Sequence, residues 1–329
     1  MSLPLQHPEP AGASNPDSAE ARTGNIFVLL DHLGVIQFSG QDAGTFLQGQ
    51  LSCDVAGVSP RSSTHGAYCS PKGRMLANFL LWREDAGFFM ALSRDILPSI
   101  QKHISKFVLR SKVRVSIASD SVVLAGISGP HADRVLRSTF SDFPAKPNEV
   151  CHAPGVGTVL RLTDGRLFLA LAAAAAPGLL GQLEGSLSRS DARIWRWLDI
   201  RQGLPLVTAS TQDQLIPQMA NLELIGGVSF DKGCYTGQEV VARAQHRGKV
   251  KRRMFLANVS APTEAGDALY SEDLGDQASG MVVNSEASPD GGNDLLAVVQ
   301  TASREGSTVH LKSLGGPVLR FLALPYSVE

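Results

Sequence analysis

The chain has 329 residues, of which 43% are hydrophobic and 19% are charged, values typical of a soluble globular protein with a sizeable core. Its longest uncharged run, residues 167–183, is interrupted by Pro177 and Gly178 and is shorter than the roughly 20 apolar residues of a membrane span. Residues 1–24 contain no apolar leader and are expected to form a disordered tail, so the sequence predicts a cytoplasmic protein.

The region that follows the tail is expected to mix strands and helices. Apolar runs predict strands at residues 26–30, 35–38, 67–69, 74–82, 88–92 and 113–117. Helices are expected over residues 42–50 and from Asp95 onward, where isoleucines recur at helical spacing. Ser70-Pro71-Lys72-Gly73 has the pattern of a tight turn between two strands. Hairpins of this kind make a sheet largely antiparallel, which indicates an α+β fold.

A second unit of the same kind is expected at about residues 119–190. Its strands lie near residues 122–127, 156–162 and 167–171, and its helices begin at Pro130 and Pro177. The proline-rich segment 139–156 is expected to be a long exposed loop. A helix over residues 192–202 follows, with Trp197 on its core side and Trp195 on the other side, at the border of a pocket.

The pattern of apolar and polar residues changes after Arg253. Short strand-like runs alternate with loops at residues 254–259, 280–283, 295–299, 308–311 and 318–322. This pattern predicts a small all-β domain, a barrel or a sandwich, over residues 249–329. The main α+β region then spans residues 25–248.

The net charge of −1 conceals an asymmetry along the chain. Residues 1–24 carry −2 and residues 254–329 carry −7, which leaves +8 for the middle. The positive charges are concentrated at Arg243, Arg247, Lys249, Lys251, Arg252 and Arg253. Such a run forms either a solvated basic face or an anion site for a polyglutamate tail, a phosphate or RNA. Aromatic residues make up only 6% of the chain and no RNA-binding motif is present, so direct nucleic-acid binding is not expected.

None of the four cysteines forms a CxxC pair, so we predict neither a metal site nor a complete iron–sulfur site. Cys234 has a distinctive setting. Thr236 and Glu239 have the spacing of a capping box, which predicts a helix that starts just after Thr236. The positive end of that helix, together with Lys232, would favour a thiolate at Cys234. The alternative is a small buried cysteine in a tight turn, and the spacing alone leaves both interpretations open.

The segment 232–239, Lys-Gly-Cys-Tyr-Thr-Gly-Gln-Glu, matches every fixed position of the K-G-C-Y-x-G-Q-E signature. Through it the chain resembles the YgfZ proteins of the glycine-cleavage T-protein superfamily. Further blocks agree at residues 46–50, 54–55, 71–74, 216–218, 221–222 and 241–243. The resemblance implies two ferredoxin-like α+β units around a central folate pocket, followed by a C-terminal β-barrel. It also implies binding of tetrahydrofolate or a one-carbon derivative. Its implied partners are iron–sulfur proteins or their assembly factors, tRNA-modifying enzymes included, met transiently.

The resemblance assigns a possible catalytic role to Cys234. The folate-binding residues that it implies are Gln218, Asn221, Lys232, Gly233, Tyr235, Gln238, Glu239, Arg243 and Trp195. Two departures from the T-protein matter. The strand over residues 73–82 lacks the aspartate that the T-protein uses, and the T-protein's pterin-binding glutamate falls at Met219. Gln218 and Asn221 would then hydrogen-bond the ring instead. An accessory protein is therefore expected rather than glycine cleavage. A tetrahydrofolate-dependent one-carbon transferase and an RNA-binding protein are the alternatives.

Overall fold

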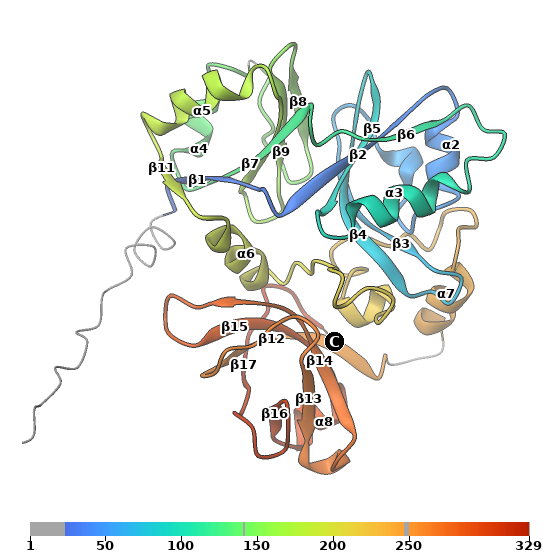
Figure 1. Cartoon of the computed structure of the whole chain (residues 1–329), viewed down its shortest axis with the longest axis vertical. Coiled ribbons are helices and arrows are strands. Elements are labelled where there is room, and N and C mark those ends of the chain that lie inside the picture. The colour runs from blue at the N-terminus through green and yellow to red at the C-terminus, as the bar shows by residue number, and fades with distance from the viewer. Residues whose placement is uncertain (1–23, 141, 247–249, 329) are drawn as a thin grey trace, which may run out of the picture.

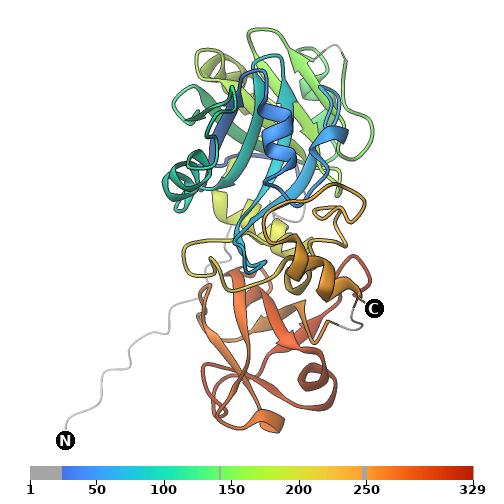
Figure 2. The same ribbon diagram turned by 90° about the vertical axis from the view of Figure 1, so that its right-hand side faces the viewer.

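The computed structural model describes residues 24–140, 142–246 and 250–328. Two α+β units lie side by side, and a third domain, built mainly of strands, lies below them (Figures 1 and 2). Residues 1–23 of the expected tail lie outside the described residues. So do Arg247 and Lys249 of the basic run, and the expected domain boundary at residues 248 and 249.

The first unit is a five-stranded antiparallel sheet in the order β3-β4-β5-β2-β6. Its strands are β2 (Leu33–Ser39), β3 (Thr64–Cys69), β4 (Met75–Glu84), β5 (Gly87–Ser93) and β6 (Arg114–Ile117). The short helices α2 (Ala43–Gln48) and η1 (Val55–Gly57) connect β2 to β3. Helix α3 (Leu97–Ser105) packs Ile100 and Ile104 into the same core cluster as Phe38 and Met90, so it covers one face of the sheet.

The second unit is a six-stranded sheet in the order β11-β1-β7-β10-β9-β8. Its elements are β1 (Ile26–Leu29), β7 (Val122–Ser128), α4 (Ala132–Leu136), β8 (Val150–Ala153), β9 (Gly157–Arg161), β10 (Leu167–Ala172), α5 (Ala176–Glu184) and β11 (Ser188–Ser190). Strand β1 pairs with β7 and β11, whereas β2 pairs with β5 and β6. The two first strands therefore belong to different sheets and tie the units together. Strand β8 lies in the segment that was expected to be a loop.

The apolar residues of β10 show how the second sheet is enclosed. Phe168 and Ala170 join a core cluster that also contains Trp82 and Phe89 of the first unit. Their neighbours in the strand face the opposite way, into the cluster with α4 and α5; they are Leu167, Leu169 and Leu171. Successive side chains of a strand point to opposite faces, so a strand that is buried on both faces is apolar throughout.

The C-terminal domain is a curled antiparallel sheet in the order β16-β13-β14-β15-β12-β17. Its elements are β12 (Arg252–Val259), β13 (Ala268–Ser271), η3 (Glu272–Leu274), β14 (Ala278–Ala287), β15 (Asn293–Gln300), α8 (Thr301–Gly306), β16 (Val309–Leu311) and β17 (Arg320–Leu322). The amide of Leu319 donates to the carbonyl oxygen of Val309 at 2.9 Å, and that of Leu311 donates to Pro317 at 2.9 Å. These bonds join β16 to the segment before β17, and the expectation of a barrel-like domain is confirmed.

The same alternation of side chains packs this barrel against the two α+β units, which together are called the body below. In β15, Leu295 and Ala297 point into the barrel core, whereas Leu296 and Val298 join the core cluster of the first unit. Helix α6 (Ala192–Arg201) also lies on the barrel, and its Trp197 Nε1 donates to Asp294 Oδ2 at 2.9 Å. The following segment crosses between body and barrel and contains η2 (Pro217–Ala220) before α7 (Gln238–His246) begins.

Candidate functional site

The loop that carries Cys234 is anchored to the body by hydrogen bonds of the residues that precede the cysteine. Ser229 N donates to the Ser52 carbonyl oxygen at 2.9 Å, and Ser52 Oγ donates to the Gly227 carbonyl oxygen at 2.6 Å. Further along, Lys232 Nζ donates to the carbonyl oxygens of Leu51 at 2.7 Å and Cys53 at 2.8 Å. The loop is therefore held in place before and within the Lys-Gly-Cys motif.

Lys232 itself holds the loop through contacts inside the protein. Its ammonium group lies 5.2 Å from the centre of the Tyr235 ring, and burial lowers the pKa of Lys232 although Cys53 and Asp54 oppose that change. Tyr235 is buried, which raises the pKa of its phenol. The side chains on either side of Cys234 thus hold the loop, and the lysine that the sequence placed beside the thiol has its donors directed to two backbone carbonyls.

Gly237 sets the start of α7. Its φ is +84°, in the left-handed region that favours glycine, and a Cβ there would lie 2.5 Å from the Ser70 carbonyl oxygen. The helix begins at Gln238, one residue later than the capping box predicts. The Glu239 carboxylate accepts from Arg243 Nη2 at 2.9 Å on the helix surface. The prediction that Thr236 and Glu239 cap the helix reciprocally is therefore wrong. Gly237, which packs closely against the Ser70–Gly73 turn, precedes the first residue of the helix instead.

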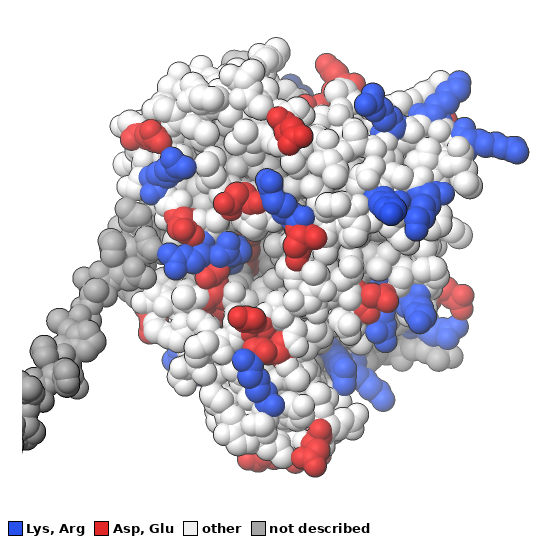
Figure 3. All heavy atoms as spheres, viewed as in Figure 1, with Lys and Arg blue, Asp and Glu red and all other residues white. Residues whose placement is uncertain are grey.

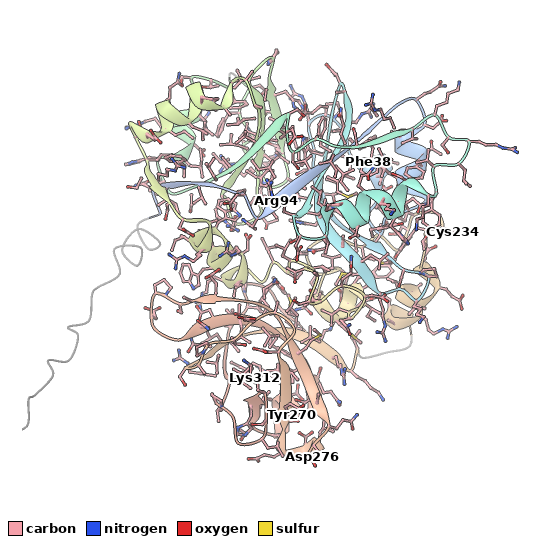
Figure 4. All side chains as sticks on the ribbon, viewed as in Figure 1. Phe38, Arg94, Cys234, Tyr270, Asp276 and Lys312 are labelled. Carbon is pink, nitrogen blue, oxygen red and sulfur yellow. The ribbon has the colours of Figure 1, made fainter. Side chains whose placement is uncertain are left out.

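Cys234 differs from the other cysteines in its exposure. It lies at the outer edge of the molecule, near the start of α7 (Figure 4). Cys53 and Cys69 are each 1% exposed, and burial raises their pKa values to about 12. Cys151 is 9% exposed and its pKa is also raised, first by burial. The interpretation of Cys234 as a small buried residue is therefore wrong, whereas it holds for Cys53 and Cys69.

Gln218 and Asn221 use their amide nitrogens for hydrogen bonds within the protein. Both are fully buried, and Gln218 Nε2 donates to the Val241 carbonyl oxygen at 2.7 Å. Asn221 Nδ2 donates to the Met254 carbonyl oxygen at 2.8 Å. These bonds attach η2 to α7 on one side and to β12 on the other. The two amide nitrogens are therefore structural, whereas Gln218 Oε1 is buried with no hydrogen-bond partner among the described residues.

Trp195 is also internal. It is 2% exposed, and the Arg166 guanidinium lies 4.2 Å from the centre of its ring. Arg166 in turn pairs with Asp164 and Asp199. A Cβ on Gly126 would overlap the indole, so the ring packs directly on β7. Trp195 is therefore a core residue and not the border of a pocket, whereas Trp197, which was predicted to be core, is half-buried and packs against the same core cluster.

A cavity of about 610 Å³ lies where the body, α7 and the barrel meet. It is lined by Lys72, Arg74, Gln214, Leu215, Ile216, Met219, Val240, Arg252, Ala278, Gly280, Met281 and Val298. The lining combines an apolar surface with three cations and no carboxylate, and its size suits a small-molecule ligand. Figure 3 shows basic side chains, with acidic ones among them, on this side of the molecule near the junction with the barrel.

None of the nine residues predicted to bind folate lines this cavity. Met219 and Val240 line it, whereas Gln218 and Asn221 are fully buried and are not part of its lining. Lys72 and Arg74 had no assigned role, although they belong to one of the motif blocks, and Arg252 was one of six basic residues in a run. Within the described ranges, no group of three His, Cys, Asp or Glu residues could hold a metal ion. No described helix is long and apolar enough to cross a membrane.

Comparison with known proteins relates this chain to a known family. The model of the GCVT N-terminal domain family matches residues 4–153. The tRNA-modifying protein YgfZ of Enterobacter sp. (strain 638) is 34% identical over 317 residues, which cover 94% of this chain and 96% of the relative. The chain belongs to the YgfZ family.

A solved structure supports the fold of this YgfZ-family chain. The glycine cleavage system aminomethyltransferase T from Bartonella henselae matches it with a TM-score of 0.78 at 19% identity, covering 95% of this chain and 89% of that one. The expected α+β, T-protein-like architecture with a C-terminal barrel-like domain is therefore confirmed. At this identity the likeness concerns the fold alone.

Proposed function

We propose that this YgfZ-family chain is a cytoplasmic folate-binding accessory protein that supports iron–sulfur proteins, tRNA-modifying ones included, with Cys234 as its reactive group. The observation that carries the proposal is one exposed thiol on a braced loop that leads into α7, whose Val240 lines a cation-rimmed cavity. The family relative is a tRNA-modifying protein by name, which is consistent with such a role.

The residues around the cavity fit a reduced folate. Met219, Met281 and Val298 provide an apolar surface for a flat pteridine and aminobenzoyl body. Lys72, Arg74 and Arg252 are suited to the glutamate carboxylates, since charge-assisted hydrogen bonds are the stronger class. When bound, tetrahydrofolate would supply a carrier for one-carbon groups.

Cys234 can contribute one ligand and no more to an iron–sulfur cluster. Clusters of the common kinds use four cysteine thiolates, and the other three cysteines of this chain are buried. Any contact of Cys234 with a cluster, a sulfur atom or a one-carbon adduct is therefore transient or shared with a partner protein.

A one-carbon transferase reaction is less favoured by the residues of β4. From Met75 to Arg83 the strand has no carboxylate, and Glu84 Oε1 accepts from Trp82 Nε1 at 2.8 Å and Thr158 Oγ1 at 2.6 Å. Asn78 lies within the strand, with its side chain bonded to the backbone of Pro205 and Val207. Transfer of an aminomethyl group needs a group that handles a proton or stabilises a cation, and this strand presents none.

Calorimetric titration with tetrahydrofolate and its one-carbon forms tests the folate proposal. We expect saturable binding, and we expect Lys72→Ala combined with Arg252→Ala to weaken it about tenfold through loss of carboxylate contacts. A reduced pterin without the glutamyl group should bind both proteins equally. Arg320→Ala, which removes an exposed cation of β17 that does not line the cavity, is the matched control.

Two results would count against this proposal. Absence of saturation with every reduced folate at millimolar concentration would show that the chain is not a folate-binding protein. Folate binding that is unchanged in the Lys72 and Arg252 variant would show that the ligand occupies another part of the molecule.

A further inference from the structure

The turn between α3 and β6 projects from the first unit at the right-hand edge of Figure 1. It presents two large apolar side chains to solvent: Leu109 is 88% exposed and Phe107 is 42% exposed. Leu109 has a φ of +46°, in the left-handed region that residues with a Cβ rarely adopt. A strained backbone thus holds a leucine outward, where it contributes nothing to the core.

The turn is held by its own hydrogen bonds and by contacts to the body. Ser111 N donates to the Val108 carbonyl oxygen at 2.8 Å, and Lys112 N donates to Asp42 Oδ2 at 2.7 Å. A Cβ on Gly40 would overlap the Lys112 carbonyl oxygen, so the backbone packs closely there. The exposed position of Leu109 is therefore built into the fold.

Basic side chains surround the two apolar ones. The exposed cations of this region are Lys102, Lys106, Arg110, Lys112 and Arg114. None of the five forms an ion pair within the part of the chain that the structure describes. Basic side chains gather along this edge in Figure 3. By contrast, Arg243 and Arg253 of the basic run noted in the sequence are both paired with glutamates.

The surface beside the turn is hollowed. A shallow concavity of about 760 Å³ is lined by Asp42, Phe107, Val108, Leu109, Arg110 and Ser111. Next to it, β6 is an edge strand of its sheet, and its Ile117 is 43% exposed. Apolar side chains in a concave site with a charged surround are the usual anatomy of a protein-binding patch.

We propose that this turn, residues 106–114 with Lys102, is a docking surface for an acidic segment of another protein that places an apolar side chain in the hollow. Five unpaired cations call for a partner of opposite charge, and the exposed leucine provides an apolar anchor. A phosphate backbone would leave Leu109 uncovered, and the Phe107 ring already packs 5.4 Å from that of His103. A flat anionic bilayer would leave the hollow unfilled.

Fluorescence titration of the full chain tests the docking proposal. The ligands are a labelled amphipathic peptide with glutamates around a leucine stripe, its lysine counterpart, polyuridylate, and vesicles of phosphatidylglycerol. We expect the acidic peptide to bind best, with an affinity that falls as salt is raised. Leu109→Asn and the pair Arg110→Glu with Lys112→Glu should each weaken that binding at least tenfold.

Matched variants on the barrel keep the result interpretable. Val318 is 53% exposed and Arg320 is an exposed cation, so Val318→Asn and Arg320→Glu should leave the binding unchanged. Leu109→Asn should melt no lower than the parent, because asparagine tolerates a positive φ better than leucine. Tighter binding of polyuridylate or vesicles, or equal losses in the turn and barrel variants, would overturn the proposal.

Discussion

Lys232 and Cys234 are two residues apart in one motif, yet the loop turns them to opposite sides. The lysine reaches inward to the carbonyl oxygens of Leu51 and Cys53, while the thiol remains in solvent. A buried ammonium group needs hydrogen-bond acceptors, and two backbone carbonyls provide them. At the residue scale, therefore, accessibility distinguishes Cys234 from the other cysteines.

This difference predicts the order in which the four thiols react. Iodoacetamide at neutral pH should label Cys234 first, because Cys53 and Cys69 are buried and their pKa values are raised to about 12. Peptide mass spectrometry with time gives the four rates. Cys234→Ala should melt like the parent, since an exposed side chain contributes little packing, but should no longer support iron–sulfur enzymes in cells that lack the protein. Equal labelling of all four cysteines would contradict the interpretation.

At the scale of elements, two arginines of the basic run, Arg243 and Arg253, have different roles. Arg243 forms an exposed i,i+4 pair with Glu239 on α7, with side chains 55% and 85% exposed. Arg253, at the start of β12, pairs with Glu223, and these side chains are 15% and 7% exposed. Its Nη1 also donates to the Gln218 carbonyl oxygen at 2.9 Å. Arg253 thus joins the first barrel strand to η2.

The two arginines should therefore differ in their effect on stability. Arg253→Met should lower the free energy of unfolding by about 3 kcal/mol, because it leaves the buried Glu223 carboxylate unpaired. Arg243→Ala should change it by less than about 0.5 kcal/mol, as is usual for an exposed helix pair. Urea denaturation of both variants measures the difference. Adding Glu223→Leu to Arg253→Met should recover part of the loss, and a failure to recover any would argue against a buried charge as its cause.

At the scale of the whole molecule, the units are held together through shared cores and a few buried ionisable groups. His32 lies in the connection between β1 and β2, where the two sheets meet, and neither of its ring nitrogens has a partner among the described residues. Burial, helped by Arg196 and Arg94 and opposed by Asp31, lowers the pKa of His32 from 6.5 to about 4. The folded protein therefore keeps this imidazole neutral in a range where the unfolded chain protonates it.

Stability should consequently fall as the pH is lowered from 6.5 to about 4, the interval set by the two pKa values of His32. In that interval the unfolded state binds the proton, and the contribution reaches at most about 3 kcal/mol. Asp199 acts in the opposite direction, because burial raises its pKa to about 6. The comparison of the parent with His32→Gln across pH isolates the histidine. Parallel stability curves for the two proteins would contradict this assignment.

The sequence by itself determined the features that depend on local pattern. Helix α6 (Ala192–Arg201) and the strands of the C-terminal domain other than β13 (Ala268–Ser271), which was not predicted, follow from apolar spacing. Ser70-Pro71-Lys72-Gly73 forms the expected turn, with Gly73 N donating to the Ser70 carbonyl oxygen at 2.8 Å. The motif over residues 232–239 was sufficient to indicate the family, because its side chains occupy fixed positions along one short loop. These features need only neighbours within a few residues of one another.

Only the tertiary structure decided which side chains are enclosed. Gln218 and Trp195 were expected at a ligand. The Gln218 amide is instead bonded to α7, and the Trp195 indole packs on β7. Both α7 and β7 are distant in the sequence from the residue that they bury. Strand β1 joins the second sheet for the same reason, since its partners are β7 and β11. The cation-rimmed cavity and the exposed Leu109 likewise depend on several segments at once. Burial is a property of long-range packing, and no local pattern of residues specifies it.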